Sequence, residues 1–374
     1  MRILQTEIPP GFIDLGNGNP DPGLLPMKII ERAAGRYFTD ADPDTLQYGA
    51  EAGNGDFLAA LAEFLSSIYG SKVDPCSLFT STGASSALDL LCTLYTQPGD
   101  LIFVEEPSYF LALRIFKDHG LRVLSIPLDN DGLRIDILEE LLEQYQPKFI
   151  YTIPTFHNPA NLTLSKSRRE KLVQLAQEHD FIVIADEVYQ FLAYTQEPPE
   201  PIALFTRSIP QVISINSFSK ILAPGLRLGW IQAHDSVIDD LSKCGLLDSG
   251  GGMNPFTSAI VRHLIESGDL TDNLHSLRAA YLERMQAMTA ALDHYLPDAE
   301  YHKPQGGFFV WGKVPGRDTT ILRNKARSLK IDFRPGILFS SQAGMTDHLR
   351  LAYCYYDPDD IEMGIQKLAD CLKP

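Results

Sequence analysis

One lysine and one arginine stand in a stretch that otherwise has the composition of a protein interior. The stretch is SFSKILAPGLRLGW, residues 217–230, and it directly follows the apolar run VISIN. A lysine buried in such surroundings is unfavourable unless it has a partner or a chemical role. Lys220 is therefore a candidate for chemistry, and Arg227 supplies a permanent positive charge that suits a phosphate.

Other side chains that could take part in a reaction also follow apolar runs. Tyr109 follows LIFVEE, and Asn158 follows KFIYTIP. Asp186 lies at the end of FIVIADE, with Tyr189 just beyond it. In open α/β sheets, ligands bind beyond the carboxyl ends of the strands. We therefore expect an amide, a carboxylate, an aromatic ring and the lysine to meet at one edge of a sheet.

A candidate anion site precedes these residues. The run FTSTGASSALDLLCTLY, residues 79–95, predicts a strand end, a turn of small residues and then a helix. Small residues at a helix start expose backbone N–H groups at the positive end of the helix dipole. Ser85 and Ser86 add hydroxyl groups there.

A single ligand accounts for all of these features. It carries a phosphate, a flat ring, an atom that needs a carboxylate and a carbon that reacts with an amine. Pyridoxal phosphate has these parts: a lysine binds it as a Schiff base, and an acidic residue keeps its pyridine nitrogen protonated. Taken singly, each residue also has an ordinary explanation. Asn158 could start a turn, Tyr109 could be a core residue, and Lys220 could extend its amine to solvent.

The alternation of elements predicts an α/β fold. The runs at 101–106, 121–129, 148–154, 181–187 and 211–217 are apolar through their middles, as strands buried on both faces of a parallel sheet are. Residues 165–180 lie between two of these runs and have the pattern of a crossover helix. We expect a large domain with a mostly parallel central sheet flanked by helices.

The end of the chain predicts a smaller α+β domain. Leu274, Leu277, Tyr281, Met285, Met288 and Leu292 recur at helical spacing. The segments 306–314 and 348–356 then have the pattern of strands, and the N-terminal segment 11–23 is expected to join them. We place the large domain at residues 42–280 and the small domain at residues 1–41 with 281–374.

Composition excludes several classes of function. The 374 residues carry 32 basic and 48 acidic side chains, a formal charge of −16. So acidic a protein is not expected to bind nucleic acid or an anionic membrane. Its five cysteines lack the spacing of a disulfide framework or a zinc site, and no metal is expected. No signal-peptide core or membrane-length apolar run is present, so a cytoplasmic location is expected.

The chain resembles fold-type I pyridoxal-phosphate enzymes (the PLP transferase fold), specifically class I/II aminotransferases near the 2-aminoadipate and kynurenine aminotransferase-like group. Residues 217–230 are similar to the S-x-S-K…G-x-R-x-G-W segment of that family. The resemblance extends over nearly the whole chain. It implies that Lys220 forms the Schiff base, with Ser217, Ser219 and Arg227 around the phosphate of pyridoxal 5'-phosphate.

Further motifs imply the remaining cofactor contacts. The segment ADEVY resembles the family's D-x-x-Y, which implies Asp186 on the pyridine nitrogen and Tyr189 near the phenolic oxygen of the ring. Asn158 in HNP matches the asparagine bonded to the same oxygen, and Tyr109 in EEPSYF matches the stacking aromatic residue. The segment TGAS implies phosphate contacts from Gly83, Ala84 and Ser85.

The resemblance also implies a second subunit and a substrate site. LQYGAEAG, residues 46–53, is similar to the segment whose tyrosine reaches the phosphate of the neighbouring subunit, which makes Tyr48 a partner residue in a homodimer. Arg350 in LRLAY matches the arginine that binds the substrate carboxylate, with Asn158 close by. Gly18 matches a position in the loop that closes over the substrate.

One departure from the family pattern lies beside the site. Many relatives have N-P-T-G where this chain has Asn158-Pro159-Ala160-Asn161. Asparagine adopts the positive φ of a glycine more readily than other residues do, so we expect the turn to survive. Arg334 and His157 also lie near the site, with either functional or ordinary roles open.

The implied function is amino-group transfer between an L-amino acid and a 2-oxo acid, by a ping-pong mechanism with a Lys220 aldimine. Lyase, decarboxylase and racemase activities share the same cofactor residues and remain alternatives. A non-enzymatic regulator with an aminotransferase-like domain is disfavoured by the acidic charge. A dinucleotide-binding dehydrogenase is disfavoured because Asp21 replaces the third glycine of G-x-G-x-x-G.

Overall fold

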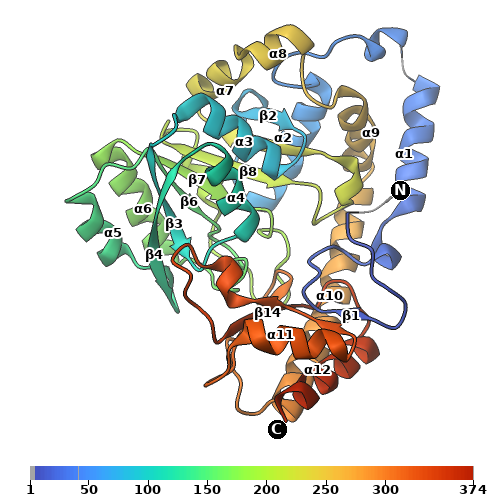
Figure 1. Cartoon of the computed structure of the whole chain (residues 1–374). Coiled ribbons are helices and arrows are strands. Elements are labelled where there is room, and N and C mark those ends of the chain that lie inside the picture. Colours follow the sequence, from blue (N-terminus) through green and yellow to red (C-terminus); the bar gives the residue numbers. More distant parts are fainter. Residues whose placement is uncertain (1–4, 41, 374) are drawn as a thin grey trace.

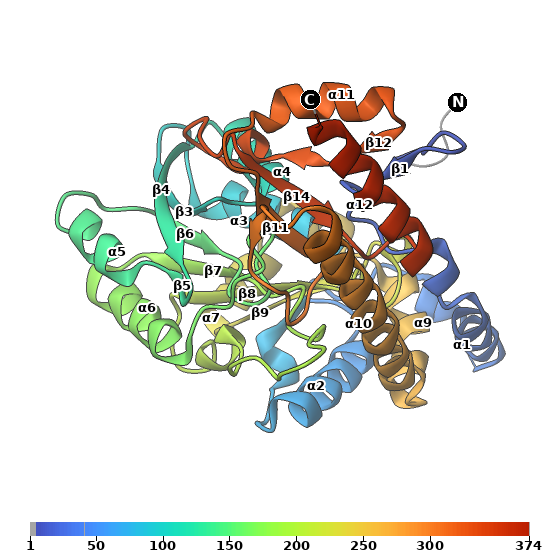
Figure 2. The same ribbon diagram turned by 90° about the horizontal axis from the view of Figure 1, so that it is seen from below.

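A mostly parallel sheet forms the centre of the larger part of the chain (Figures 1 and 2). The computed structural model describes residues 5–40 and 42–373. Strands β8, β7, β6, β3 and β4 run parallel, whereas β2, β9 and β5 pair antiparallel. The predicted α/β sheet is confirmed. In spatial order the strands are β2 (Leu78–Ser81), β9 (Gly229–Ala233), β8 (Val212–Ser217), β7 (Ile182–Asp186), β6 (Phe149–Thr152), β3 (Leu101–Glu106), β4 (Arg122–Asp129) and β5 (Gly132–Leu133).

Helices cover both faces of this sheet. Val183 and Ala185 of β7 enter a core shared with α5 (Ile135–Leu142) and α6 (Lys166–His179). Ile184, between them, joins the core on the other face. That second core also receives α2 (Gly55–Tyr69), α3 (Ala84–Tyr95) and α4 (Phe110–Asp118). Burial of alternate side chains on opposite faces explains the unbroken apolar runs.

A smaller antiparallel sheet lies below the large one in Figure 1. Its strand order is β10-β11-β14-β13, and α11 and α12 contribute to its core. Near it, β1 pairs in parallel with β12, so the N-terminal segment joins the C-terminal part as expected. The elements are β1 (Ile13–Asp14), β10 (Glu300–Tyr301), β11 (Phe309–Lys313), β12 (Ile331–Asp332), β13 (Arg334–Pro335), β14 (His348–Ala352), α11 (Thr319–Ser328) and α12 (Pro358–Leu372).

One long helix is shared by the two parts. In α10 (Asp269–Tyr295), Leu274 and Leu277 join the large core, and Met288 and Leu292 join the small one. The helical spacing predicted for this segment is confirmed. Figure 2 shows α10 passing from α9 to α12. The remaining helices are α1 (Met27–Asp40), which packs on α9 (Pro255–Glu266), and α7 (Asp235–Ser242) and α8 (Gly245–Gly250). The division into domains at residues 42 and 281 stays a prediction.

No helix in the described ranges combines the length and the apolar character that crossing a bilayer requires.

A buried ion pair supports the sheet next to the predicted site. Nη1 of Arg169, on α6, lies 3.9 Å from Oε1 of Glu187, and both side chains are almost fully buried. Burial lowers the pKa of Arg169 to about 10, although the negative charge of Glu187 acts to raise it. The guanidinium also donates to the carbonyl oxygens of Leu164 and Pro154. These bonds fix both ends of the loop that carries Asn158.

We expect Arg169→Met to lower the free energy of unfolding by about 3–5 kcal/mol, because it leaves the Glu187 carboxylate buried without its counter-charge. Urea unfolding measures the effect. Arg168→Met is the matched control on the same helix, since Arg168 pairs with Asp129 at a partly exposed position. Its loss is expected near about 1 kcal/mol. Equal losses in the two variants would contradict a special role for the buried pair.

Candidate active site

The parallel strands bring the predicted residues to one edge of the large sheet, opposite the small one. Tyr109 follows β3 and Asn158 follows β6. Asp186 is the last residue of β7, and Lys220 follows β8 in the neighbouring position of the sheet. The carboxyl ends of parallel strands share one edge, which explains the gathering. The electrostatic influence of Asp186 on both Tyr109 and Lys220 reflects this proximity.

The Asp186 carboxylate is buried and only half satisfied. Its Oδ2 accepts a hydrogen bond of 2.7 Å from the hydroxyl of Tyr151. Its Oδ1 is buried and has no hydrogen-bond partner among the described residues. Burial raises the pKa of Asp186 to about 6, although the Tyr151 hydrogen bond and the charge of Lys220 oppose the rise. A buried carboxylate oxygen without a partner suits a ligand that donates an N–H.

The Lys220 amine forms no direct ion pair with any residue that the structure describes. Its Nζ lies 3.3 Å from the carbonyl oxygen of Gly18 and 5.4 Å from the ring centre of Phe308. Burial lowers the pKa of Lys220 below its ordinary value, and the positive charge of Arg350 acts in the same direction. A lowered pKa increases the share of neutral amine, which is the nucleophilic and basic form.

Arg350, in the middle of β14, reaches the same space from the small sheet. Its Nη1 donates to Asn158 Oδ1 at 2.8 Å, and its Nη2 donates to the carbonyl oxygen of Gly16 at 2.9 Å. The guanidinium lies 4.0 Å from the ring centre of Phe309. Burial lowers the pKa of Arg350 to about 10, so the group stays cationic at neutral pH. Its Nε is buried with no partner among the described residues.

Two tyrosines border this space. Tyr109 stands at the start of α4, and burial raises its pKa to about 12. The ring of Tyr189 packs edge-on against Phe308 and Phe309, with ring centres 5.5 and 6.0 Å apart. Burial also raises the pKa of Tyr189. Both phenols therefore stay neutral, as hydrogen-bond donors or stacking surfaces.

The start of α3 forms an open cradle. Gly83 precedes the helix with a φ of 108°, and no side chain caps the helix start. Ala84 is half-buried and Ser85 is exposed in the first turn. A Cβ atom on Gly83 would lie 3.0 Å from Nη2 of Arg227. Uncapped N–H groups beside a guanidinium form a site for an anion such as phosphate.

The end of β8 contributes hydroxyl groups. Ser217 is buried, Ser219 is half-buried, and their hydroxyl oxygens lie 2.9 Å apart. Arg227 is exposed, and its Nη2 donates to the carbonyl oxygen of Thr82, next to Gly83. The structure therefore brings Ser217, Ser219 and Arg227 toward the start of α3. Together with the free oxygen of Asp186, these groups fit the phosphate and the ring nitrogen of pyridoxal phosphate.

Tyr48 does not join this cluster within one chain. It follows the short helix η2 (Pro43–Leu46), and 84% of its surface is exposed. Gly18, by contrast, lies inside the cluster, since a Cβ atom there would be 3.0 Å from the Phe309 ring and 3.7 Å from Arg350 Nη2.

The two residues with open roles have partners of their own. Arg334 forms a fork with both carboxylate oxygens of Asp14, at 3.1 and 3.0 Å. Nε2 of His157 lies 3.1 Å from Oε2 of Glu105, and both side chains are buried. Arg334 is thus neither a solvated loop residue nor a free cation, and His157 takes a supporting position beneath Asn158.

Some residues of the site were missed from the sequence. Tyr151, which holds Asp186, pairs with Ile184 across the sheet, two residues before Asp186. Side chains two apart on a strand share a face, so this contact could have been foreseen once the strands were paired. Phe308 and Phe309 gave no signal beyond an apolar strand start.

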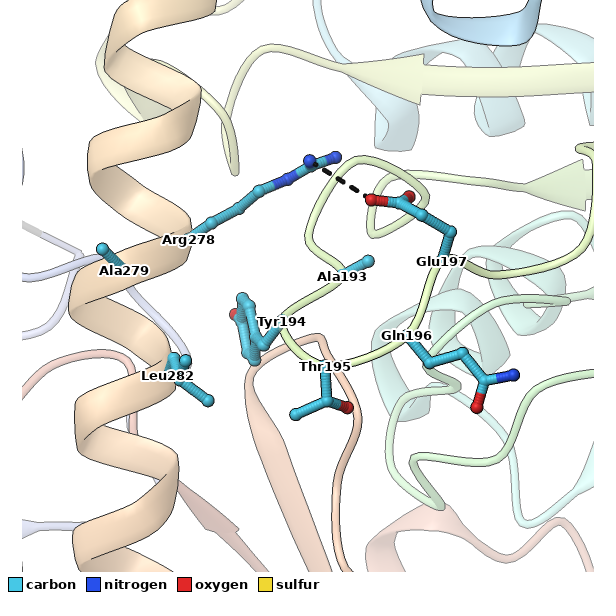
Figure 3. A pocket seen from close by; sticks show the side chains of 8 residues that line it. All are labelled: Ala193, Tyr194, Thr195, Gln196, Glu197, Arg278, Ala279 and Leu282. Atoms are coloured by element: carbon cyan, nitrogen blue, oxygen red, sulfur yellow. Dashed lines mark ion pairs between the residues drawn. The ribbon is translucent and has the colours of Figure 1, made fainter.

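The hollow shown in Figure 3 is separate from this cluster. It has a volume of about 350 Å³ and lies between residues 193–197 and α10. In it Nη1 of Arg278 faces Oε1 of Glu197 at 3.6 Å. None of the predicted site residues lines it.

Comparisons with known proteins agree with the geometry. The family profile described as Aminotransferase class I and II matches residues 10–368. A relative, aromatic-amino-acid aminotransferase 1 of Thermococcus litoralis, is 35% identical over 100% of this chain and 90% of its own length.

Solved structures give the same result. A multiple substrate aminotransferase from Thermococcus profundus superposes with a TM-score of 0.91 at 35% identity, over 97% of this chain and 92% of that chain. An alpha-aminoadipate aminotransferase from Thermus thermophilus, complexed with N-(5'-phosphopyridoxyl)-L-leucine, gives 0.88 at 30% identity, over 97% and 92%. The ligand of that complex is a pyridoxyl phosphate derivative, in agreement with the expected cofactor.

The raised pKa of Asp186 predicts that this carboxylate destabilises the cofactor-free fold. Its pKa moves from 3.8 to about 6 on folding, so the native state holds the proton more tightly, and stability falls as pH rises through that interval. We expect Asp186→Asn to raise the free energy of unfolding of the cofactor-free protein by roughly 1–3 kcal/mol at pH 8, with a smaller gain at pH 5.

Urea unfolding at the two pH values measures this difference. The control is Asp332→Asn, because both oxygens of Asp332 accept hydrogen bonds from Arg323, and its loss should destabilise the fold. A gain at pH 5 as large as that at pH 8 would contradict the assignment.

Proposed function

The chain belongs to the class I and II aminotransferases, and we propose that Lys220, Asp186 and Arg350 carry out its chemistry. It is a pyridoxal-phosphate-dependent enzyme that moves an amino group between an amino acid and a 2-oxo acid. The observation that carries the residue assignment is the unpartnered oxygen of Asp186 on the same sheet edge as the Lys220 amine.

Several residues would hold the cofactor. Asp186 Oδ1 would accept the N–H of the pyridine ring, Tyr109 would stack on the ring, and Tyr189 and Asn158 would donate to its phenolic oxygen. Asn158 uses its Oδ1 for Arg350, so its amide N–H groups are the donors for that role. The phosphate would be held by the remaining residues, namely Gly83, Ala84, Ser85, Ser217, Ser219 and Arg227. When bound, pyridoxal phosphate supplies a carbon that exchanges amines and a ring that accepts electron density.

Lys220 is the residue that binds the cofactor and moves the proton. Burial lowers the pKa of its amine, so the neutral form that can accept a proton is more abundant near neutral pH. Its Nζ would remove the proton from the substrate Cα and hold it for return in the same half-reaction. The same atom moves the proton in the opposite direction when a 2-oxo acid is the substrate. This reversal is the basis of a ping-pong reaction.

Arg350 would bind the α-carboxylate of the substrate. A guanidinium presents N–H groups in a fork that matches two carboxylate oxygens, and Arg350 Nε has no partner among the described residues. Asn158 and the carbonyl oxygen of Gly16 fix the orientation of the fork. Gly18 leaves room beside it, because any side chain there would meet the Phe309 ring.

We expect Lys220→Ala to reduce turnover below detection. It should also remove the visible absorbance band that arises from the covalent link between the cofactor and Lys220. The assay offers a panel of amino acids with 2-oxoglutarate or pyruvate as acceptor. An acceptor-dependent reaction separates amino transfer from lyase, decarboxylase or racemase activity.

Lys243→Ala is the control for this experiment, since Lys243 is an exposed lysine paired with Asp239. It should leave both absorbance and turnover unchanged. Turnover that survives in Lys220→Ala would refute the assignment.

We propose in addition that the enzyme is a homodimer. Large apolar side chains are exposed on neighbouring elements, and the rings of Phe38 and Phe256 lie 6.0 Å apart at the surface. Helix α1 packs on α9 at the right of Figure 1, and α8 lies at the top of the same view. Exposed apolar patches of this kind mark protein interfaces. The residues are Met27, Phe38, Leu46, Tyr48, Leu246 and Phe256. In such a dimer Tyr48 reaches the phosphate of the partner's site.

A hybrid dimer tests the shared site. Tyr48→Ala and Lys220→Ala subunits should each be poorly active alone, because each symmetric dimer lacks one group in both sites. After unfolding and refolding of an equal mixture, half of the dimers contain one intact site in two, so about one quarter of wild-type activity should return. Sedimentation confirms the dimer. No recovery in a dimeric mixture would contradict the role of Tyr48.

A cytoplasmic location stays a prediction of the sequence, as does the lack of nucleic-acid and membrane partners.

A further inference from the structure

Asn161 stands where many relatives have glycine, and its backbone has the conformation of a glycine. Its φ is 54°, in the left-handed region, and its N–H donates to the carbonyl oxygen of His157. Asparagine tolerates this region better than most residues, although glycine tolerates it best. The turn alone therefore does not require an asparagine.

The side chain of Asn161 forms a bridge to the small sheet. Its Nδ2 donates to the carbonyl oxygen of Gly306 at 2.9 Å and to that of Phe309 at 2.7 Å. The amide group of asparagine has two N–H donors, and both are used. The side chain is almost fully buried, so these bonds are made away from solvent. Glycine at position 161 could make neither.

The bridged segment, residues 306–309, carries the two rings that border the reactive groups. Phe308 faces Lys220 Nζ at 5.4 Å, and Phe309 lies against Arg350 at 4.0 Å. The segment lies so close to the 156–161 turn that a Cβ atom on Gly306 would be 2.4 Å from the Phe156 ring. A shift of this segment would therefore move both rings.

Two tyrosine hydroxyls complete the attachment of the segment. Tyr353 donates to the carbonyl oxygen of Gly306 at 2.8 Å. Tyr194, which also borders the hollow in Figure 3, donates to that of Gly307. Tyr353 follows β14 of the small sheet. Asn161 and Tyr194 attach the segment to the larger part of the chain through their side chains, beside the backbone bond from Gly307 to Leu192.

We propose that Asn161 is a positioning residue for substrate binding, an inference that rests on the proposed role of Arg350. The turn that carries Asn161 also carries Asn158, whose Oδ1 holds Arg350 Nη1. One turn therefore fixes the guanidinium through Asn158 and the ring beneath it through Asn161. The asparagine in place of glycine tightens the carboxylate-binding side of the site more than the cofactor side, because the bonded carbonyl of Phe309 lies next to Arg350.

Two substitutions test this proposal. Asn161→Gly keeps the left-handed backbone free of strain and removes both hydrogen bonds. Asn161→Asp keeps the shape of the side chain and replaces the N–H donors by an oxygen that faces two carbonyl groups. Asp180→Gly is the matched control, because Asp180 also has a positive φ of 52° but lies exposed at the end of α6.

We expect both Asn161 variants to raise KM for the amino donor at least tenfold, equivalent to about 1.4 kcal/mol of binding free energy. Turnover at saturation should stay within about threefold of wild type, and the dissociation constant of pyridoxal phosphate should rise by a smaller factor than KM. Amide hydrogen exchange of residues 304–312 should be faster, with or without cofactor. Asp180→Gly should change none of these quantities.

A binding measurement separates this proposal from the proposed function. 2-Aminoisobutyrate has no Cα proton, so the absorbance change of the bound cofactor on its addition reports binding without turnover. If wild type binds 2-aminoisobutyrate but transfers no amino group from any amino acid of the panel that has a Cα proton, the proposed function fails, and the binding and exchange data still test Asn161. Unchanged binding in the Asn161 variants, even with faster exchange, would overturn the proposal. A larger loss of cofactor affinity than of amino-acid affinity would overturn it as well.

Discussion

The site depends on two cations and one carboxylate that are placed among apolar side chains. Arg350 and Asp186 are buried and Lys220 is partly buried, and burial shifts the pKa of each group toward its neutral form. A charge in such a place needs compensation from neighbours or from a ligand. Here the compensation inside the chain is incomplete, because an oxygen of Asp186 and a nitrogen of Arg350 lack partners among the described residues. A ligand with complementary charges completes it.

Two neighbouring acidic residues, Asp186 and Glu187, differ in whether their oxygens have hydrogen-bond partners within the protein. Glu187 is as deeply buried as Asp186, but its oxygens accept bonds from Ser214 and from the backbone of Ile202 and Ala203. Alternation at the strand end directs the two side chains to different surroundings. Glu187 is satisfied within the protein and stabilises the layer beneath the site. Asp186 keeps one oxygen free for the cofactor.

The site also requires both halves of the chain. The large sheet delivers Asp186 and Lys220 through the ends of adjacent parallel strands, whereas Arg350 comes from the antiparallel sheet. Helix α10 contributes to both cores and so ties the two halves together. Aromatic rings fill the junction between them. Such rings exclude water, which strengthens every charge interaction inside the site.

The sequence by itself determined the central sheet and the groups at its edge. Unbroken apolar runs require burial on both faces, and a polar residue at the end of each run must then lie at the common carboxyl edge. That reasoning was sufficient for Tyr109, Asp186 and Lys220. It also anticipated the left-handed backbone of Asn161, because few residue types accept a positive φ.

Which residues far apart in the chain touch each other becomes visible only in the folded protein. The Tyr151 hydroxyl on Asp186, the fork between Arg334 and Asp14, and the amide bridge from Asn161 to the segment before β11 join residues far apart in the chain. No local pattern encodes such contacts, because they depend on which strands pair and on how the two parts of the chain pack. Burial in the folded protein also raises the pKa of Asp186, so the chemistry of this carboxylate depends on the packing.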